Sequence, residues 1–214
     1  MEILLAIGVA LVLNFAVNLL CNNVLFPGQS TEPVPPGEVI DEGMLTDTDR
    51  KMAVRSREII EDNLGEQPVD ALLTLNAEDR VKAVGEVLEE LSRLYGVDIK
   101  GAEFTNALPN NVAGAYYHQE HMIRINVNAL LSNDRAVLLD VLDTVVHELR
   151  HAVQWSMIEG KNPVWEASEA HRQALARNFA HYVRYDRDVR GYQMQLVERD
   201  AMTFAATVLR GVNG

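Results

Sequence analysis

The stretch T-V-V-H-E-L-R-H-A-V-Q-W, Thr144 to Trp155, decides the expected fold and chemistry of this chain. It lies in a longer segment that begins after the cap candidates Ser132, Asn133 and Asp134 and runs to about Glu159. Apolar residues recur along this segment at helical spacing and predict one long helix with a buried face: Leu138, Leu142, Val145, Leu149 and Val153.

Two histidines stand four residues apart in this helix, with a glutamate directly after the first. Residues four apart share a helix face, so the imidazoles of His147 and His151 can converge on one cation. Glu148 is rotated by about 100° from His147 and lies beside the cation, where it can act as general base for a water that zinc acidifies. The alternative interpretation is a core helix that carries two histidines by chance.

A catalytic zinc normally takes three protein ligands, so this hypothesis requires another ligand downstream. Cys21 is the one cysteine of the chain, which excludes a cysteine-rich site and leaves His, Asp or Glu. Glu198, within Q-L-V-E-R-D-A-M-T-F-A, is our candidate, because the small and apolar residues after it favour packing against the first helix. His171 and His181 remain competing ligands.

Further residues are candidates for supporting roles around the metal. We expect Asp200 to orient a ligand histidine or to pair with Arg150. Attack on a carbonyl also requires a group that stabilises the developing negative charge, and the candidates are Tyr192, His181 and His118. His118 also has a simpler structural interpretation, as sheet surface or packing, which it shares with Tyr116, Tyr117 and His121. Core positions are expected for Trp155, Trp165 and Phe204.

From residue 45 onward, the sequence predicts helices first, then the strands of a short sheet, and then further helices. Capping and spacing indicate helices between Thr46 and Gly65 and from Asn76 to Gly96. Residues 97–127 favour strands, with a β-hairpin that turns near Gln119 and Glu120. Two more helices are expected from Ala167 to about Tyr185 and from Gln195 to about Arg210. The expected class is α+β, with a small, mostly antiparallel sheet packed on the helix of the two histidines.

The first 44 residues are expected to lie outside this domain. Ile3 to Leu20 is uncharged and long enough to cross about 30 Å of hydrocarbon, so residues 1–23 are a candidate single-pass transmembrane anchor of unknown orientation. Its asparagines and alanines recur every four residues on one face, which would favour association with another helix. The alternative is a buried or amphipathic helix. Residues 24–44 include the proline- and glycine-rich Phe26 to Gly43 and predict an extended, solvated linker.

Composition restricts the possible partners. The formal net charge is -12 and the pI is near 4.9. Nucleic-acid binding requires clustered Lys and Arg, so we expect no nucleic-acid partner.

The residues H-E-L-R-H-A-V-Q and Q-L-V-E-R-D-A-M-T-F-A, preceded by a hairpin that ends I-R-I-N, resemble the gluzincin type of zincin metallopeptidases. The likeness covers roughly Val97 to Ala206. Within this group, the residues are similar to those of small bacterial and phage-borne ImmA/IrrE-like peptidases. It implies a zincin-like fold and bacterial or phage origin, with His147, His151 and Glu198 as ligands of one Zn²⁺ and Glu148 as base. It also implies that an edge strand, Met122, Ile123, Arg124, Ile125 and Asn126, binds extended substrate by β-augmentation. No third histidine follows His151 at metzincin spacing.

The function we expect is a zinc-dependent endopeptidase, tethered to a membrane through residues 3–20, that cleaves a protein or peptide substrate. The alternative is a non-catalytic, zinc-binding regulatory or interaction protein that keeps the zincin fold. Glu148 distinguishes the two functions, because only the enzyme requires it.

Overall fold

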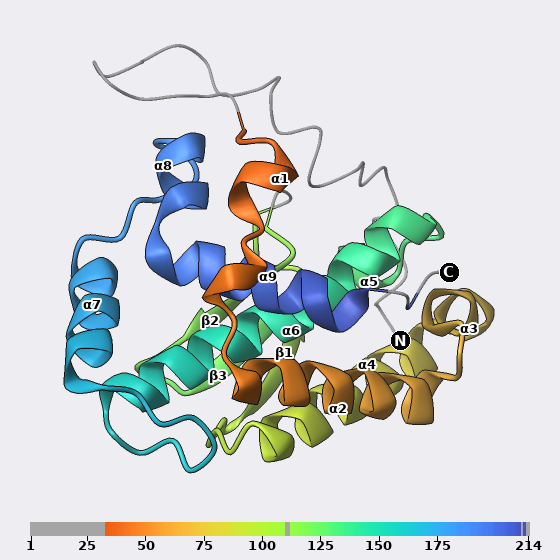
Figure 1. Cartoon of the computed structure of the whole chain (residues 1–214). Helices are drawn as coiled ribbons and strands as arrows, with labels where there is room; N and C mark the ends of the chain where they lie inside the picture. The colour runs from red at the N-terminus through yellow and green to blue at the C-terminus, as the bar shows by residue number, and fades with distance from the viewer. Residues whose placement is uncertain (1–32, 110–111, 211, 213–214) are drawn as a thin grey trace.

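Helices surround one small sheet in the computed structural model, which describes residues 33–109, 112–210 and 212. In Figure 1, α6 lies in the middle of the molecule with α9 alongside it and the strands behind it. The predicted α+β class is confirmed. The described elements are α1 (Pro36–Val39), the 3-10 helix η2 (Glu42–Met44), α2 (Asp47–Leu64), α3 (Pro68–Thr74), α4 (Ala77–Leu94), β1 (Gly101–Thr105), β2 (Gly114–Tyr117), β3 (Met122–Asn126), α5 (Val127–Leu130), α6 (Arg135–Ile158), α7 (Glu169–Ala180), α8 (Val189–Met194) and α9 (Leu196–Leu209).

The ends of the long helices follow local capping chemistry. Thr46 and Asp49 form a capping box at the start of α2, in which each side chain accepts the backbone N–H of the other residue. Helix α2 ends at Gly65, whose φ of 82° suits glycine. Asn76 caps α4 through the backbone N–H of Asp79. The predicted boundaries of these two helices are therefore confirmed.

The sheet is mixed, with the strand order β1-β3-β2. Strands β2 and β3 pair antiparallel through the predicted hairpin, whose turn covers residues 118–121. Strand β1, however, pairs parallel with β3. The expectation of a mostly antiparallel sheet was wrong, because alternating side chains report a strand's faces but neither its direction nor its neighbours.

The same topology corrects the predicted substrate strand. Met122–Asn126 forms β3, which is hydrogen-bonded on both sides and is the central strand of the described sheet. Ile123 and Ile125 are fully buried on the face toward the core. A central strand has no unpaired backbone edge, so Met122, Ile123, Arg124, Ile125 and Asn126 are not an edge strand.

Strand β2 is the edge that lies against α6. Gly114 makes this close approach possible, because a Cβ there would lie 2.5 Å from Thr144 Cγ2 and 2.9 Å from the Arg124 carbonyl oxygen. Thr144 stands one turn before Glu148 on α6. The glycine therefore brings the edge of the sheet to the part of α6 that carries the two histidines.

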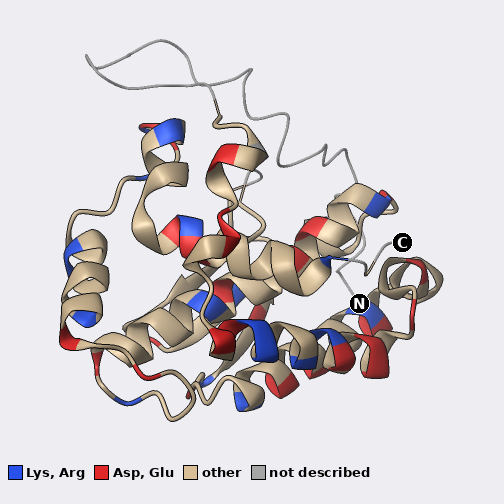
Figure 2. Cartoon of the chain, viewed as in Figure 1, with Lys and Arg blue, Asp and Glu red and all other residues tan. Residues whose placement is uncertain are grey.

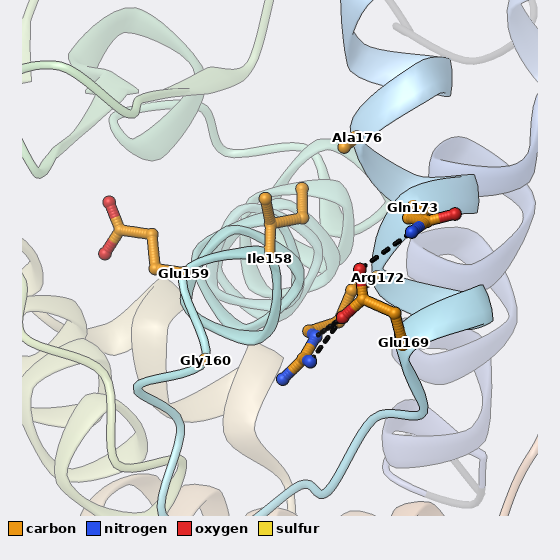
Figure 3. Close-up of a pocket in the computed structure, with 7 residues that line it drawn as sticks. All are labelled: Ile158, Glu159, Gly160, Glu169, Arg172, Gln173 and Ala176. Atoms are coloured by element: carbon orange, nitrogen blue, oxygen red, sulfur yellow. Dashed lines mark hydrogen bonds and ion pairs between the residues drawn. The ribbon is translucent and has the colours of Figure 1, made fainter.

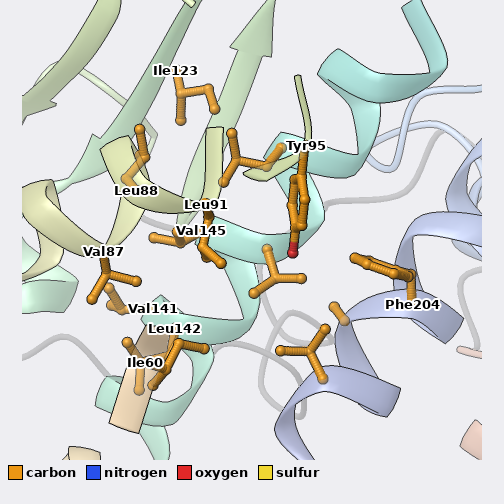
Figure 4. Close-up of a cluster of buried hydrophobic side chains, with 14 of the residues drawn as sticks. Ile60, Val87, Leu88, Leu91, Tyr95, Ile123, Val141, Leu142, Val145 and Phe204 are labelled. Carbon is orange, nitrogen blue, oxygen red and sulfur yellow. The ribbon is translucent and has the colours of Figure 1, made fainter. Parts of the chain in front are cut away.

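One hydrophobic core joins the long helices and the sheet (Figure 4). The Tyr95 ring packs edge to face against Trp165 and Phe204, and its hydroxyl lies 2.7 Å from Ser56 Oγ. The core is built from α2, α4, β3, α6 and α9, with the labelled side chains Ile60, Val87, Leu88, Leu91, Tyr95, Ile123, Val141, Leu142, Val145 and Phe204. This core holds α6 and α9 in fixed relative positions.

The outer face of α2 is polar. Blue and red segments alternate along this helix in Figure 2, and Arg55 and Glu58 form an ion pair on it. Such an exposed pair contributes little to stability. The role of α2 in the fold therefore comes from its buried face.

The described end of the predicted linker packs on the domain. Val34 and Val39 are buried, the Val34 N–H donates to Gln193 Oε1 at 2.6 Å, and the Asp41 N–H donates to Thr203 Oγ1 at 3.1 Å. The expectation of an extended, solvated spacer was wrong for residues 34–44, because Pro36 starts a short helix, as proline can, and two valines bury their side chains. The remainder of the predicted linker and the candidate anchor of residues 1–23 lie outside the described residues.

Among the residues that the structure describes, none of the helices combines the length and hydropathy required to cross a membrane.

Candidate metal centre

Helix α6 presents the two histidines from a well-anchored position. Asp134 caps the helix by accepting the backbone N–H of Ala136 at 2.8 Å. Val145, Leu149 and Val153 are fully buried and fasten the opposite face. The helix therefore extends from Arg135 to Ile158 with little freedom to rotate, which fixes the direction of the histidine side chains.

Helix α9 brings Glu198 to the same place. It lies alongside α6, and the small side chains of Ala201 and Ala205 are fully buried on it. Small residues permit close helix approach, and the Glu198 side chain is completely shielded from solvent. A fully buried carboxylate requires a charged or hydrogen-bonding partner.

The two histidines supply that partner. His147 Nε2 lies 3.1 Å from Glu198 Oε2, and His151 Nε2 lies 3.2 Å from Glu198 Oε1. One ligand atom from each of the three residues lies within 4.8 Å of the others. Zinc bonds of about 2.0–2.2 Å in a tetrahedral arrangement separate ligand atoms by roughly 3.3 Å, so the residues fit a zinc ion. His147, His151 and Glu198 thus form a group that can hold a metal ion.

The electrostatics of this group favour a bound cation. Burial opposes ionisation of Glu198, but the adjacent His151 and His147 outweigh it and hold the pKa of the carboxyl well below its usual range. Burial likewise opposes a charge on His151, yet Glu198 raises its pKa to about 9, and the pKa of His147 is also raised. Negative potential from Glu198 therefore attracts positive charge, which a proton or a metal ion can supply.

Glu148 lies beside the ligand group without joining it. Its Oε2 accepts the backbone N–H of Tyr116, in edge strand β2, at 2.7 Å. Glu148 is buried, and its negative charge contributes to the raised pKa of both His147 and His151, so the carboxylate lies near these ligands as well as the edge of the sheet. This is a suitable position for a base that acts next to the metal.

A hydrogen-bonded chain holds His151 from behind. His151 Nδ1 lies 2.9 Å from Gln154 Oε1, and the Gln154 amide donates to the Val197 carbonyl at 2.9 Å and to Asp200 Oδ2 at 2.7 Å. An amide oxygen accepts, so this contact assigns the ring proton to Nδ1 and leaves the Nε2 lone pair for a metal. Gln154 stands in the motif quoted above, but local spacing alone did not indicate its role.

Arg150 and Asp200, which were expected to interact, are joined by two hydrogen bonds of 2.8 and 2.9 Å. On its other side, Arg150 Nη1 forms an ion pair with Asp49 Oδ1 at 2.8 Å, without the alignment of a hydrogen bond. The Trp165 indole N–H also donates to Asp49. A buried network therefore links the first turn of α2 to the residue that orients Gln154.

Of the other predicted site residues, Tyr192 lies near the ligand group, whereas His171 and His181 do not belong to it. Tyr192 lies close to Glu198, and burial and this carboxylate raise the pKa of Tyr192 well above its usual value. His171 and His181 are exposed on α7 and at its end, and neither belongs to the metal-ligating group found among the described residues. The competing histidine ligands are therefore separate from the buried centre.

Tyr182 is a site residue that the sequence interpretation missed. Its hydroxyl donates to Glu198 Oε1 at 2.6 Å, although 40% of the residue is exposed. Tyr182 follows the end of α7 in a segment without regular structure, so no periodic pattern indicated that it faces α9.

The three aromatic residues expected in the core have different environments. Trp165 and Phe204 are buried, as expected. Trp155 is only partly buried, and its ring stacks at 4.1 Å against the ring of His118. The core interpretation was therefore wrong for Trp155, which lies one turn beyond His151 on the face of the candidate ligands.

Comparison with protein-family models, with curated proteins and with solved structures gave no match to this chain. The gluzincin resemblance consequently remains a prediction that depends on the residues themselves.

Proposed function

We propose that this chain is a zinc-dependent endopeptidase of the gluzincin type. The observation that carries the proposal is the meeting of His147 Nε2, His151 Nε2 and both Glu198 oxygens in one buried group, with Glu148 adjacent. Three nitrogen and oxygen ligands suit a catalytic zinc, which keeps a further position for the reaction. A bound zinc would supply Lewis acidity for the carbonyl and lower the pKa of the attacking water.

Glu148 would be the general base of this reaction. Its carboxylate stands beside the ligands and would accept the proton of the attacking water, then deliver it to the leaving amine. The hydrogen bond from the Tyr116 N–H holds one carboxylate oxygen and leaves the second oxygen for this transfer. The base is thus oriented by the edge of the sheet.

Tyr182 and Tyr192 are the candidates for stabilising the negative charge that develops on the carbonyl oxygen. Both lie next to Glu198, and the raised pKa of each keeps its hydroxyl protonated at neutral pH. A neutral hydroxyl can donate a hydrogen bond to an oxyanion. Tyr182 is the better candidate, because its partial exposure makes it reachable from a substrate.

The test combines metal content with cleavage. We expect purified protein to hold one zinc per chain and to cleave peptides. Unbiased identification of the newly formed termini measures the cleavage. Glu148→Gln should keep the zinc and lose cleavage, whereas Glu198→Ala should lose the zinc as well. Gln119→Ala, in the exposed hairpin turn, is the matched control and should keep both.

Two outcomes would contradict the proposal in different ways. Equal zinc in wild type and Glu198→Ala would remove Glu198 as a ligand. Zinc without cleavage in the wild type, or unchanged turnover in Glu148→Gln, would favour the non-catalytic zinc-binding function.

We also propose that residues 3–20 tether the peptidase to a membrane. Their length and lack of charge support this proposal. The full-length chain should sediment with membranes and require detergent for release, whereas deletion of residues 1–23 should free it. Full solubility without detergent would refute the tether.

A further inference from the structure

One face of α6 continues beyond the candidate ligands toward α7. His147, His151, Trp155 and Ile158 follow one another at spacings of four, four and three residues, which places them along one side of the helix. Helix α7 lies against this end of α6. A substrate held at the metal and running along this face would therefore meet Trp155 first.

Three aromatic rings from different elements gather at this point. The His118 ring lies 4.1 Å from Trp155, and the Phe179 ring of α7 lies 5.6 Å from Trp155 on its edge. Phe179 also lies 6.1 Å from the ring of His151. All three residues, His118, Trp155 and Phe179, are only partly buried, so apolar ring surface next to a candidate metal ligand remains open to solvent.

A separate cavity lies farther along α6. A cavity of about 380 Å³ lies between the last turn of α6 and α7 (Figure 3). Ile158 and Ala176 line it, and Glu169 binds Arg172 and Gln173 at its rim. Ile158 is seven residues beyond His151, or about 10 Å along the helix, which an extended peptide covers in about three residues. Along α6, Trp155 thus lies between the candidate ligand His151 and Ile158, which lines this cavity.

We propose that His118, Trp155 and Phe179 form a subsite, the aromatic shelf, for a bulky apolar side chain next to the bond that is cleaved. The shelf has this role only if the proposed zinc site exists. Aromatic surface favours apolar and aromatic side chains through burial and edge-to-face contact. The substrate class is therefore a peptide with Phe, Tyr, Trp, Leu or Met beside the scissile bond.

The test measures binding without turnover. Two hydroxamates that chelate zinc, one with a benzyl and one with a methyl side chain, are titrated calorimetrically into zinc-loaded Glu148→Gln protein. We expect the benzyl compound to bind at least about tenfold more tightly. Adding Trp155→Ala or Phe179→Ala should bring the two affinities within about threefold of each other, with zinc content unchanged.

Two further variants control for loss of packing. Trp155→Phe keeps an aromatic ring and should keep the preference for the benzyl compound. Val54→Ala, at an exposed position on α2, should change nothing. Equal affinities in the parent protein, or a preference that survives both alanine variants, would overturn the aromatic shelf while leaving the zinc site intact. Failure to bind zinc would overturn the proposed function and the shelf together.

Discussion

The Tyr182 hydroxyl donates a hydrogen bond to Glu198 Oε1, the same oxygen that lies 3.2 Å from His151 Nε2. A residue from the segment after α7 thus contacts a candidate metal ligand on α9. A cation bound by Glu198 would compete with this hydroxyl for the carboxylate oxygen. The hydroxyl would then be available to a substrate carbonyl.

For this reason we expect Tyr182→Phe to lower kcat by about 10²–10³, the usual cost of removing one oxyanion donor. KM and zinc content should change little, because the variant removes only the hydroxyl. Peptide-cleavage kinetics and elemental analysis measure these quantities. Tyr192→Phe is the comparison, and a larger loss of kcat there than in Tyr182→Phe would transfer the role to Tyr192.

Gln154→Ala should weaken zinc binding by about 10–100-fold. The variant removes the acceptor that orients His151 and the amide that donates to the Val197 carbonyl. Competition with a chromogenic chelator measures the zinc dissociation constant. Gln119→Ala provides the control, and an affinity in Gln154→Ala equal to that of the control would show that the amide is dispensable.

Arg150→Met should lower the free energy of unfolding by about 3–5 kcal/mol, because it leaves the carboxylates of Asp49 and Asp200 without their buried counter-ion. Urea unfolding at neutral pH measures the effect. Arg55→Met, at an exposed position on α2, should cost less than about 1 kcal/mol. Similar losses in the two variants would mean that the buried network contributes no more than a surface ion pair.

Asp140→Asn should stabilise the protein above pH 6. Burial, followed by the nearby Asp143 and Asp134, raises the pKa of Asp140 from 3.8 to about 6 in the folded state. The neutral form therefore stabilises the fold below pH 3.8, and this contribution is lost as the pH rises through 6. We expect a gain of about 1–2 kcal/mol at pH 8, after solvent screening, and none near pH 3.5.

Urea unfolding at the two pH values checks this dependence on Asp140. Asp62→Asn removes the same charge from an exposed position on α2 and controls for net charge. The same stabilisation at both pH values would exclude ionisation of Asp140 as its cause.

Much of the helical part of the fold follows from local signals. Thr46, Asn76 and Asp134 each cap a helix where the sequence indicates a start, because capping depends only on the next few residues. The short helix α3 was not predicted, although Pro68 marks its first residue, because seven residues carry too little periodicity.

The arrangement of the strands, unlike the ends of the helices, does not follow from local sequence. Ile123 and Ile125 indicate a strand with one buried face, but nothing within Met122–Asn126 reports that β1 will pair on its other side. Strand order depends on contacts between residues distant in sequence.

The candidate metal centre likewise includes residues that the sequence predicts and residues whose roles depend on tertiary contacts. His147 and His151 follow from helical geometry, and Glu198 from the requirement for a third ligand. Tyr182 and Gln154 acquire their roles from the positions of α7, α9 and their side chains, which local sequence does not specify. The partial exposure of Trp155 likewise depends on how α7 covers α6.

The ion pair between Arg150 and Asp49 bears on how short a working fragment of this chain can be. The zincin resemblance starts near Val97, yet Asp49 forms an ion pair with Arg150. Arg150 in turn binds Asp200, which accepts a hydrogen bond from the Gln154 amide that orients His151. A truncation at residue 97 would keep all three candidate ligands but delete this support and the buried face of α2. The minimal zinc-binding fragment is therefore expected to begin before Thr46, which caps the helix that carries Asp49.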